Sequence, residues 1–364
     1  MLEGGKIDGR QAVYLSITYI MATALLGVAA ITTSFARHDA WISSILATVL
    51  SIPVAWLVVK LSSLFPGKTF IEYQEEILGK YLGKITGLIY VVFFIHICSF
   101  MIREFGDFIM AAFFEDTPIL VFHIIVVAMG AYTVRHGLEV LARVNQIFLP
   151  FIILSVVMII FLTIPELDFK RLLPVLDTSP VNIIKGSITP LAWHSEILAL
   201  AMIIPFLTKP DESGKIAYKS LAMVGFIFLI VTAGSIATFG ELVAFMSYPF
   251  LNTARIINIA KFIDRLDPLI MVIWLAGGFV KITFFYYIAV LGSAQLFKLN
   301  SYRPLVLPIG IILVAMAVAV GENSIQIAHF LSHIFPVYGT FFQAAIPFLL
   351  LVIALFRKQG RTPK

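Results

Sequence analysis

Ionisable side chains interrupt several long apolar stretches of this 364-residue sequence. Lys281 lies near the middle of the apolar range 267–297, and Glu196 lies within the range 183–207. A charge at the centre of a bilayer costs at least about 2.5–3.5 kcal/mol, so such residues usually belong to a pathway, a binding site or an ion pair. Lys281 is therefore predicted either to carry a proton or to form a structural ion pair, for which Glu196 is the expected partner. Both residues are candidates for coupling charge to ligand binding.

The range 84–113 carries three more charged residues, Arg103, Glu104 and Asp107. Arg103 and Asp107 are four residues apart, which places them on one helix face and predicts an ion pair. This pair is either an anchor at the membrane interface or a gate. Glu104 points elsewhere, and the sequence assigns it no role.

Hydroxyl, imidazole and thiol groups also fall inside apolar stretches. Thr283 and Tyr287 are four residues apart and share a helix face, so their hydroxyls either bind a polar ligand or bond across helices. His96, His123 and the single cysteine, Cys98, are predicted to be packed core residues.

Two stretches are candidates for interrupted helices. In the range 183–207, Pro190 removes a backbone donor and clashes with the preceding turn, and Thr189, Trp193 and Glu196 are too polar for contact with lipid. Freed backbone groups at membrane depth persist only where they are buried or line a cavity. We therefore predict an interrupted helix whose polar residues bind a ligand; the alternative is a proline kink with a tryptophan anchor.

The range 11–35 contains a weaker signal of the same kind. Thr23, Ala24 and Gly27 form a patch of small residues near its middle, and glycine permits the dihedral angles of an unwound turn. These three residues are predicted to contact a ligand. A glycine that only lets helices pack closely is the alternative.

The composition defines the class of protein that positions these residues. Hydrophobic residues make up 60% of the chain and charged residues 13%, whereas a soluble domain has about 45–50% and about 25%. Disordered, coiled-coil and disulfide-rich classes are excluded by 32 Phe and one Cys. The prediction is an all-α polytopic membrane protein, one transmembrane domain of ten helices of about 20 residues each. The predicted spans are 11–35, 40–61, 84–113, 118–134, 139–164, 183–207, 217–240, 267–297, 304–321 and 335–356.

The distribution of basic residues predicts the orientation. Most of the 26 Lys and Arg residues fall on the side of both termini, so both termini are predicted to be cytoplasmic. The N-terminus lacks a basic region before its apolar stretch, which argues against a cleaved signal. The opposite side carries only Arg37, Lys170, Arg171, Lys185, Arg255, Lys261 and Arg265.

Ten spans divide into two halves of five, about 11–164 and 183–356. Two halves with an odd number of helices insert with opposite orientation, the inverted-repeat plan of many transporters, whose site lies where the first helix of each half is interrupted. That plan makes helices 1 and 6 the expected discontinuous ones. No nucleotide-binding, hydrolase or metal motif is present, so the chain is predicted to be neither an enzyme nor a binder of cofactors, metals or nucleic acid.

Short motifs along the whole chain resemble the B subunits of bacterial spore germination nutrient receptors, of the amino acid–polyamine–organocation transporter superfamily. They occur in the family's order and spacing. The motifs are Ile7-Asp8-Gly9-Arg10-Gln11-Ala12, His38-Asp39-Ala40-Trp41-Ile42, Phe65-Pro66-Gly67-Lys68-Thr69, Gly79-Lys80, Arg135 to Glu139 with Ala142-Arg143, Ser195-Glu196 with Ile204-Pro205-Phe206, and Asp264-Arg265-Leu266-Asp267.

The resemblance implies a sensor of small nutrients. Such a subunit binds an amino acid, or in some cases a sugar or nucleoside, in a transporter-like pocket between helices 1, 3, 6 and 8. It acts with a larger membrane subunit and a lipoprotein in the inner membrane of the spore. The alternative function is a proton-coupled amino acid symporter with Glu196 or Lys281 as the proton carrier.

Overall fold

The computed structural model describes residues 2–259, 263–264 and 266–357. Nearly all secondary structure in these residues is helical. One pair of two-residue antiparallel strands, β1 (Asn258–Ile259) and β2 (Ile263–Asp264), forms a small hairpin. The α-helices are α1 Gly9–Ala36, α2 Ala40–Leu64, α3 Phe70–Leu78, α4 Lys80–Phe113, α5 Ile119–His136, α6 Leu138–Thr163, α7 Pro180–Ser195, α8 Ser213–Phe239, α9 Pro249–Arg255, α10 Asp267–Leu296, α11 Val306–Ala319, α12 Ser324–His329, α13 Phe335–Thr340 and α14 Ile346–Phe356.

Short helices of other types connect or continue these elements. The 3-10 helices are η1 Arg37–Asp39, η2 Ile164–Glu166, η3 Phe169–Leu172, η4 Glu196–Met202, η5 Ile204–Phe206, η6 Pro210–Glu212, η7 Gly240–Phe245 and η8 Arg303–Leu305. Two π-helical turns, η9 Phe330–Ile334 and η10 Phe341–Ala345, join α12, α13 and α14 into one continuous helical segment.

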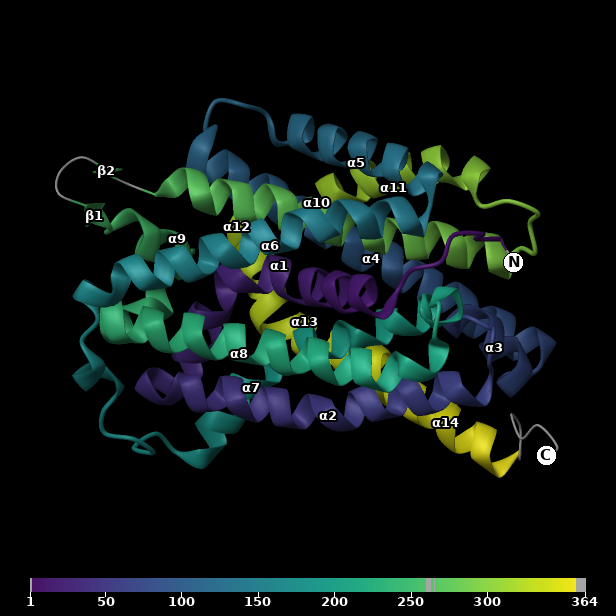
Figure 1. Ribbon diagram of the computed structural model, residues 1–364, viewed down its shortest axis with the longest axis horizontal. Coiled ribbons are helices and arrows are strands. Elements are labelled where there is room, and N and C mark those ends of the chain that lie inside the picture. The colour runs from purple at the N-terminus through teal and green to yellow at the C-terminus, as the bar shows by residue number, and fades with distance from the viewer. Residues whose placement is uncertain (1, 260–262, 265, 358–364) are drawn as a thin grey trace.

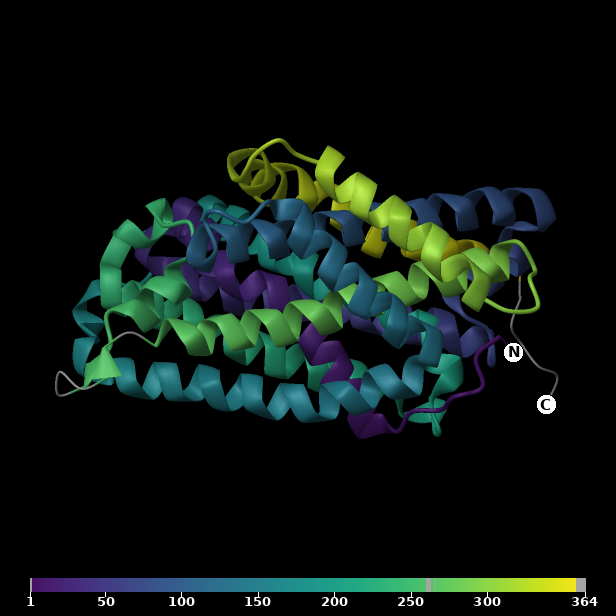
Figure 2. The same cartoon turned by 90° about the horizontal axis from the view of Figure 1, so that it is seen from above.

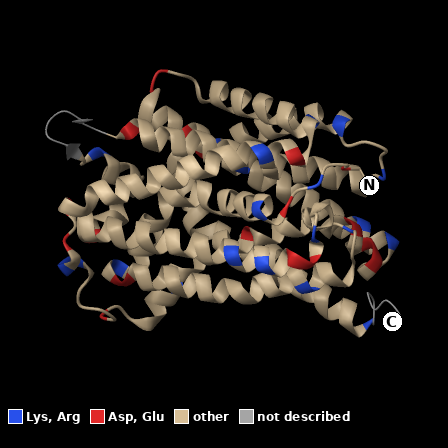
Figure 3. Ribbon diagram, in the orientation of Figure 1, with Lys and Arg blue, Asp and Glu red and all other residues tan. Residues whose placement is uncertain are grey.

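The long helices run side by side along the long axis of an elongated bundle (Figures 1 and 2). The start of the chain and the end of α14 lie at the same end of the bundle, which we call the terminal end; the opposite end, with α9 and the β1–β2 hairpin, is the distal end. Charged residues gather toward both ends and the helix termini, and long stretches of helix carry none (Figure 3). Five basic residues of the orientation argument lie outside the described residues: Lys261, Arg265, Lys358, Arg361 and Lys364.

Helical segments occupy all ten ranges that hydropathy predicts. Seven stretches of the described chain are long and apolar enough to cross a membrane, the first of which, Gly9–Leu64, contains both α1 and α2. Two further segments are shorter: the interrupted α7 and the 14-residue α11. The predicted class, a polytopic all-helical membrane protein, is confirmed.

Helices α1 and α10 form the centre of the bundle. Every residue of α10 from Gly277 to Ala294 is buried, and α1 packs against α6, α7, α8 and α10. A helix that is apolar all round buries every face. The few polar side chains on these two helices therefore find their partners inside the protein.

The predicted interruption of helix 1 is wrong: α1 is a continuous α-helix through Thr23, Ala24 and Gly27. Gly27 lies inside this helix, and a Cβ there would make only ordinary contacts, 3.7 Å from Ile31 and 4.0 Å from the ring of Trp193. The predicted interruption of helix 6 is correct, but it falls after Pro190. α7 continues through Pro190 and ends at Ser195, where the chain changes to the 3-10 helix η4.

Candidate functional site

A buried ion pair joins the three central segments of the bundle. Lys281 Nζ donates to Glu196 Oε2 at 2.8 Å, to Glu196 Oε1 at 3.1 Å and to Thr23 Oγ1 at 2.9 Å. The side chains of Lys281 and Glu196 are 0% and 1% exposed. The predicted partnership of these two residues is therefore confirmed, and Thr23 belongs to the same cluster.

The break in helix 6 supplies the position of the carboxylate. Glu196 is the first residue of η4, directly after the end of α7, and Lys281 lies in the fully buried part of α10. An ammonium group has three hydrogens to donate, and three acceptor atoms on Thr23 and Glu196 surround it. The cluster is electrically neutral and ties α1, η4 and α10 together.

A cavity of about 460 Å³ opens between this centre and the distal end. Its wall comes from the second half of α1, from α4, from residues 244–248 and from the α12–η9 segment. Its volume lies in the usual range of small-molecule sites, about 300–1,000 Å³. We call this cavity the distal vestibule. Its apolar lining includes Leu26, Ile31, Phe245, Ile327 and Leu331.

Glu104, to which the sequence assigned no role, is an acidic residue of this cavity. Its side chain lines the distal vestibule and interacts electrostatically with Lys281, Glu196 and Asp107. Among the described residues it has neither a hydrogen bond nor an ion pair with another side chain. The sequence showed only that Glu104 is a charged residue within an apolar range. Which way its side chain faces depends on how α4 is rotated about its axis.

The predicted pair of Arg103 and Asp107 is also confirmed. Arg103 Nε donates to both carboxylate oxygens of Asp107 at 3.1 Å, and Arg103 Nη1 donates to the carbonyl of Gly321. Both side chains are buried, 7% and 4% exposed. The pair thus fixes α4 to the chain just before α12, and the Asp107 side chain lines the distal vestibule.

The other predicted ligand-binding residues lie in different surroundings. Gly27 lines the distal vestibule, whereas Ala24 and Thr189 are buried without reaching it. Trp193 is buried beside Gly27. Thr283 faces α5, where a Cβ on Gly130 would lie 3.3 Å from its hydroxyl.

Tyr287 lies at the terminal end and holds the start of the chain. Its hydroxyl donates to Glu3 Oε2 at 3.0 Å, and the same oxygen accepts from Tyr302 and from the backbone N–H of Leu138. Burial, together with the nearby Glu3 carboxylate, raises the pKa of Tyr302 to about 12. Tyr302 therefore stays protonated and donates. Neither Tyr287 nor Thr283 lines the distal vestibule.

The smaller predictions for buried groups have mixed outcomes. Cys98 is buried, as expected. His96 Nδ1 lies 3.0 Å from the hydroxyl of Tyr338. His123 is buried as well, but neither ring nitrogen has a hydrogen-bond partner among the described residues.

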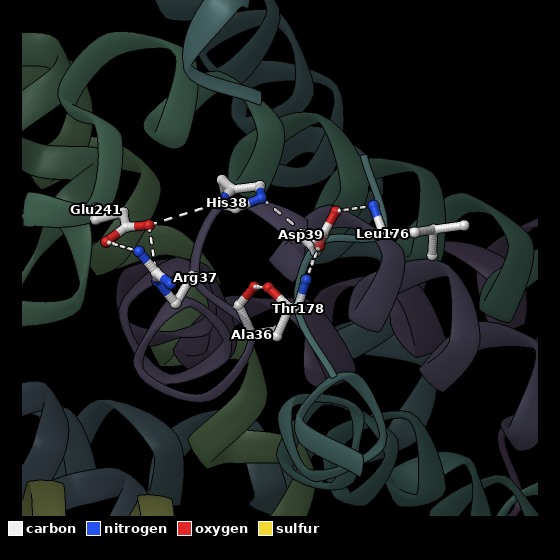
Figure 4. Close-up of polar contacts among 7 residues, drawn as sticks. All are labelled: Ala36, Arg37, His38, Asp39, Leu176, Thr178 and Glu241. Carbon is white, nitrogen blue, oxygen red and sulfur yellow. Dashed lines mark hydrogen bonds and ion pairs between the residues drawn. The ribbon is translucent and has the colours of Figure 1, made fainter. Parts of the chain in front are cut away.

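A polar network at the α1–α2 corner caps the distal end (Figure 4). Asp39 is fully buried and accepts from the backbone N–H groups of Leu176 and Thr178, both at 2.9 Å. Arg37 Nε donates to Glu241 at 2.9 Å, and a ring nitrogen of His38 lies 3.4 Å from the same oxygen. Because η7 runs from Gly240 to the vestibule residue Phe245, this network holds one wall of the vestibule.

Two further hollows lie at the terminal end. One, of about 530 Å³, is lined by Lys68, Glu72, Glu75 and Lys84, and another, of about 450 Å³, lies beside Arg10 and Lys215. They are bordered by exposed charged side chains and include none of the predicted ligand-binding residues. The distal vestibule is therefore the candidate site.

The architecture is shared with solved structures of small-solute complexes. The chain resembles MhsT in complex with L-phenylalanine, with a TM-score of 0.66 and 14% identity over 97% of this chain and 89% of MhsT. It also resembles Mhp1, a nucleobase-cation-symport-1 family transporter in a closed conformation with bromovinylhydantoin bound (TM-score 0.66, 11% identity, 99% and 82% covered). At this identity the likeness shows the fold alone. The fold defines a polytopic membrane protein with transporter architecture.

The particular family follows from the sequence comparison. The family described as Spore germination protein matches residues 6–325, and the chain belongs to it. Spore germination protein KB of Bacillus subtilis (strain 168) is 25% identical over 366 residues, covering 99% of this chain and 97% of that protein. The resemblance drawn from the short motifs is confirmed.

Proposed function

We propose that the chain is the nutrient-binding membrane subunit of a spore germinant receptor. The observation that carries the proposal is the distal vestibule, a cavity of about 460 Å³ that lies between the distal end and the buried Lys281–Glu196 cluster. A small nutrient, an amino acid by the family resemblance, enters it from the outer side of the membrane. Gly27, which lines the wall without a side chain, leaves room for it.

The remaining parts of the proposal concern the assembly. The two halves, 11–164 and 183–356, form an inverted repeat, and both termini are cytoplasmic in the inner membrane of the spore. A larger membrane subunit and a lipoprotein complete the receptor. These statements rest on the positive-inside distribution of Lys and Arg and on membership of the family.

Signalling requires that the nutrient prefer one of two conformations. Shifting a population from 1:99 to 99:1 needs a difference in binding of about 5.5 kcal/mol between them. The Lys281–Glu196–Thr23 cluster connects α1, η4 and α10 immediately inside the vestibule. It is the element that nutrient binding biases.

The alternative is a proton-coupled amino acid symporter, favoured by the transporter architecture and by a buried Lys–Glu pair. Purified protein in vesicles with an imposed pH gradient separates the two functions. Accumulation of an amino acid that Lys281→Met abolishes supports the symporter. Saturable binding without net flux, with partner membrane subunits co-purifying, supports the receptor.

Two substitutions at Gly27 test the vestibule itself. A methyl group at Gly27 meets only Ile31 at 3.7 Å and Trp193 at 4.0 Å, which are ordinary contacts. Gly27→Ala is therefore expected to keep nutrient binding and germination within about threefold of wild type, because it costs less than about 1 kcal/mol. Gly27→Trp fills the vestibule and is expected to abolish both while the protein still inserts. A normal germination response from Gly27→Trp contradicts the proposal.

A further inference from the structure

The balance of charge around the distal vestibule is uneven. Two buried basic side chains, on α4 and α10, are already paired: Arg103 with Asp107, and Lys281 with Glu196. The described lining contains no Lys or Arg, and its histidines, His329 and His333, are exposed. Glu104 is left as the acidic group in the lining that has no hydrogen bond or ion pair with a basic side chain among the described residues, and Lys281 acts on it only through electrostatics.

The backbone of α1 supplies no compensating site for an anion. In an interrupted helix 1, free N–H groups at the break would attract a carboxylate. α1 is instead continuous from Gly9 to Ala36, so the N–H groups beside Gly27 lie within the helix. α1 therefore offers an anion in the vestibule no free N–H groups, and the described lining contains no Lys or Arg to offset Glu104.

A positively charged group in the vestibule would instead be attracted by the Glu104 carboxylate. A carboxylate in a cavity with mainly apolar walls is screened little by water and strengthens a charge-assisted hydrogen bond. The described residues contain no group of three or more His, Cys, Asp or Glu side chains that could hold a metal ion. A hard divalent cation needs about six oxygen ligands, so one unpaired carboxylate in a cavity that Leu26, Ile31 and Leu331 also line suits an organic cation better.

We infer that the distal vestibule is a cation-selective site in which Glu104 binds the ammonium group of a small amine. The inference rests on the proposed nutrient function for its ligand and adds the group by which that ligand is recognised. The Glu104 carboxylate accepts the ammonium hydrogens, and the apolar walls contact the carbon chain. A carboxylate on the same ligand points away from Glu104, toward the mouth of the vestibule.

The first experiment tests charge selectivity without any nutrient. Cys98 is the one cysteine of the chain and is buried, so Ala30→Cys introduces a single reactive thiol into the vestibule lining. Its rates of modification by trimethylammonium-ethyl and sulfonato-ethyl methanethiosulfonate are each divided by the rate with a free thiol. We expect the cationic reagent to be favoured at least about tenfold. Adding Glu104→Gln removes most of this preference, and adding Glu104→Asp keeps it.

A matched control removes an acidic charge from the same end of the molecule. Glu115 is exposed in the connection between α4 and α5, outside the vestibule lining. Glu115→Gln in the Ala30→Cys background is expected to leave the preference unchanged. An equal loss in the Glu104→Gln and Glu115→Gln variants, or no preference in the Ala30→Cys protein, overturns the inference.

The second experiment uses matched ligands on the full chain in lipid nanodiscs. Alanine, leucine and phenylalanine are each compared with the corresponding amide, which keeps the ammonium group, and the corresponding 2-hydroxy acid, which lacks it. The amino acids and amides are expected to bind, and the hydroxy acids to bind at least about tenfold more weakly. Glu104→Gln weakens the amine-bearing ligands about ten- to hundredfold, the loss of a hydrogen bond to a charged group.

The outcomes separate the two proposals. Equal binding of amines and hydroxy acids, unaffected by Glu104→Gln, overturns the inference and leaves the nutrient function standing. A cation preference that depends on Glu104, without binding of any ligand in the panel, overturns amino acid recognition and leaves the cation site standing.

Discussion

A lysine in the middle of a fully buried helix is stable only if every donor has an acceptor and the charge is balanced. Lys281 meets both conditions through Glu196 and Thr23. Removing one partner of a buried pair leaves an uncompensated charge, which costs about 3–5 kcal/mol, whereas removing both partners is often tolerated. Neither Lys281 nor Glu196 can therefore be lost alone without a large cost in stability, whereas the two can be replaced together.

Lys281→Met and Glu196→Gln are each expected to lower the free energy of unfolding by about 3–5 kcal/mol. In the double variant most of this loss is expected to disappear, because no charge is left unpaired.

Thermal unfolding of the purified protein, followed by the exposure of the Cys98 thiol to a fluorogenic maleimide, measures the effect. The exposed pair of Lys298 and Glu75 is the matched control: Lys298→Met is expected to change stability by about 0–1 kcal/mol. Additive losses in the double variant contradict the ion-pair argument.

At the scale of elements, the polar network at the α1–α2 corner contains one exposed ion pair and one buried carboxylate, which differ in strength. The Arg37–Glu241 pair is largely exposed, 60% and 47%, and pairs of this kind contribute about 0–1 kcal/mol. Asp39 is 0% exposed and accepts two backbone N–H groups of the connection between α6 and α7. The buried carboxylate therefore holds the connection between α6 and α7, whereas the exposed salt bridge beside it joins the α1–α2 corner to η7 and contributes less.

Asp39→Ala is expected to release residues 173–178, since each orphaned backbone N–H costs about 1–3 kcal/mol. Limited digestion with chymotrypsin, with the cleavage sites mapped by mass spectrometry, should show cutting after Leu176 at least about tenfold faster than in the wild type. The Arg37→Ala variant, which loses the neighbouring exposed pair, should be cleaved by chymotrypsin at close to the wild-type rate. Similar cleavage of the Asp39→Ala and Arg37→Ala variants would contradict the prediction that the buried carboxylate, and not the exposed pair, holds residues 173–178.

At the scale of the whole molecule, the two ends of the bundle carry different features. The vestibule opens toward the distal end, while the start of the chain is held at the terminal end by Glu3, Tyr287 and Tyr302. In the proposed receptor, α1 and α10 are the elements that would transmit a change at the central cluster, because both run along the bundle between these ends (Figure 1). The proposed function needs such a connection, because in the proposed orientation the nutrient and the cytoplasm lie on opposite sides of the membrane.

The proposed orientation is testable with single cysteines at exposed positions. Glu115 lies in the connection after α4 at the distal end, and Lys6 lies in the segment before α1. With an impermeant maleimide applied to intact cells, Glu115→Cys is expected to be labelled, and Lys6→Cys only after lysis. Buried Cys98 gives little background. The reverse pattern of labelling would invert the proposed topology.

Long apolar ranges were enough to predict the class, the helical content and the extent of nearly every long helix, because the hydrocarbon layer demands about 20 apolar residues per crossing. Local spacing predicted the Arg103–Asp107 pair, since residues four apart share a helix face. The cost of burying a charge in lipid made Glu196 the expected partner of Lys281.

Other features depended on how helices are rotated and packed, which local patterns do not determine. The small-residue patch of helix 1 has the same composition whether it unwinds or stays helical, and the structure shows a continuous helix there. Thr283 and Tyr287 share a face, yet that face turns toward α5 and Glu3. Glu104 gained its place in the vestibule only through the rotation of α4. The sequence by itself determined which residues must be buried and paired; the tertiary structure decided which of them face a cavity, because a cavity is formed by several helices at once.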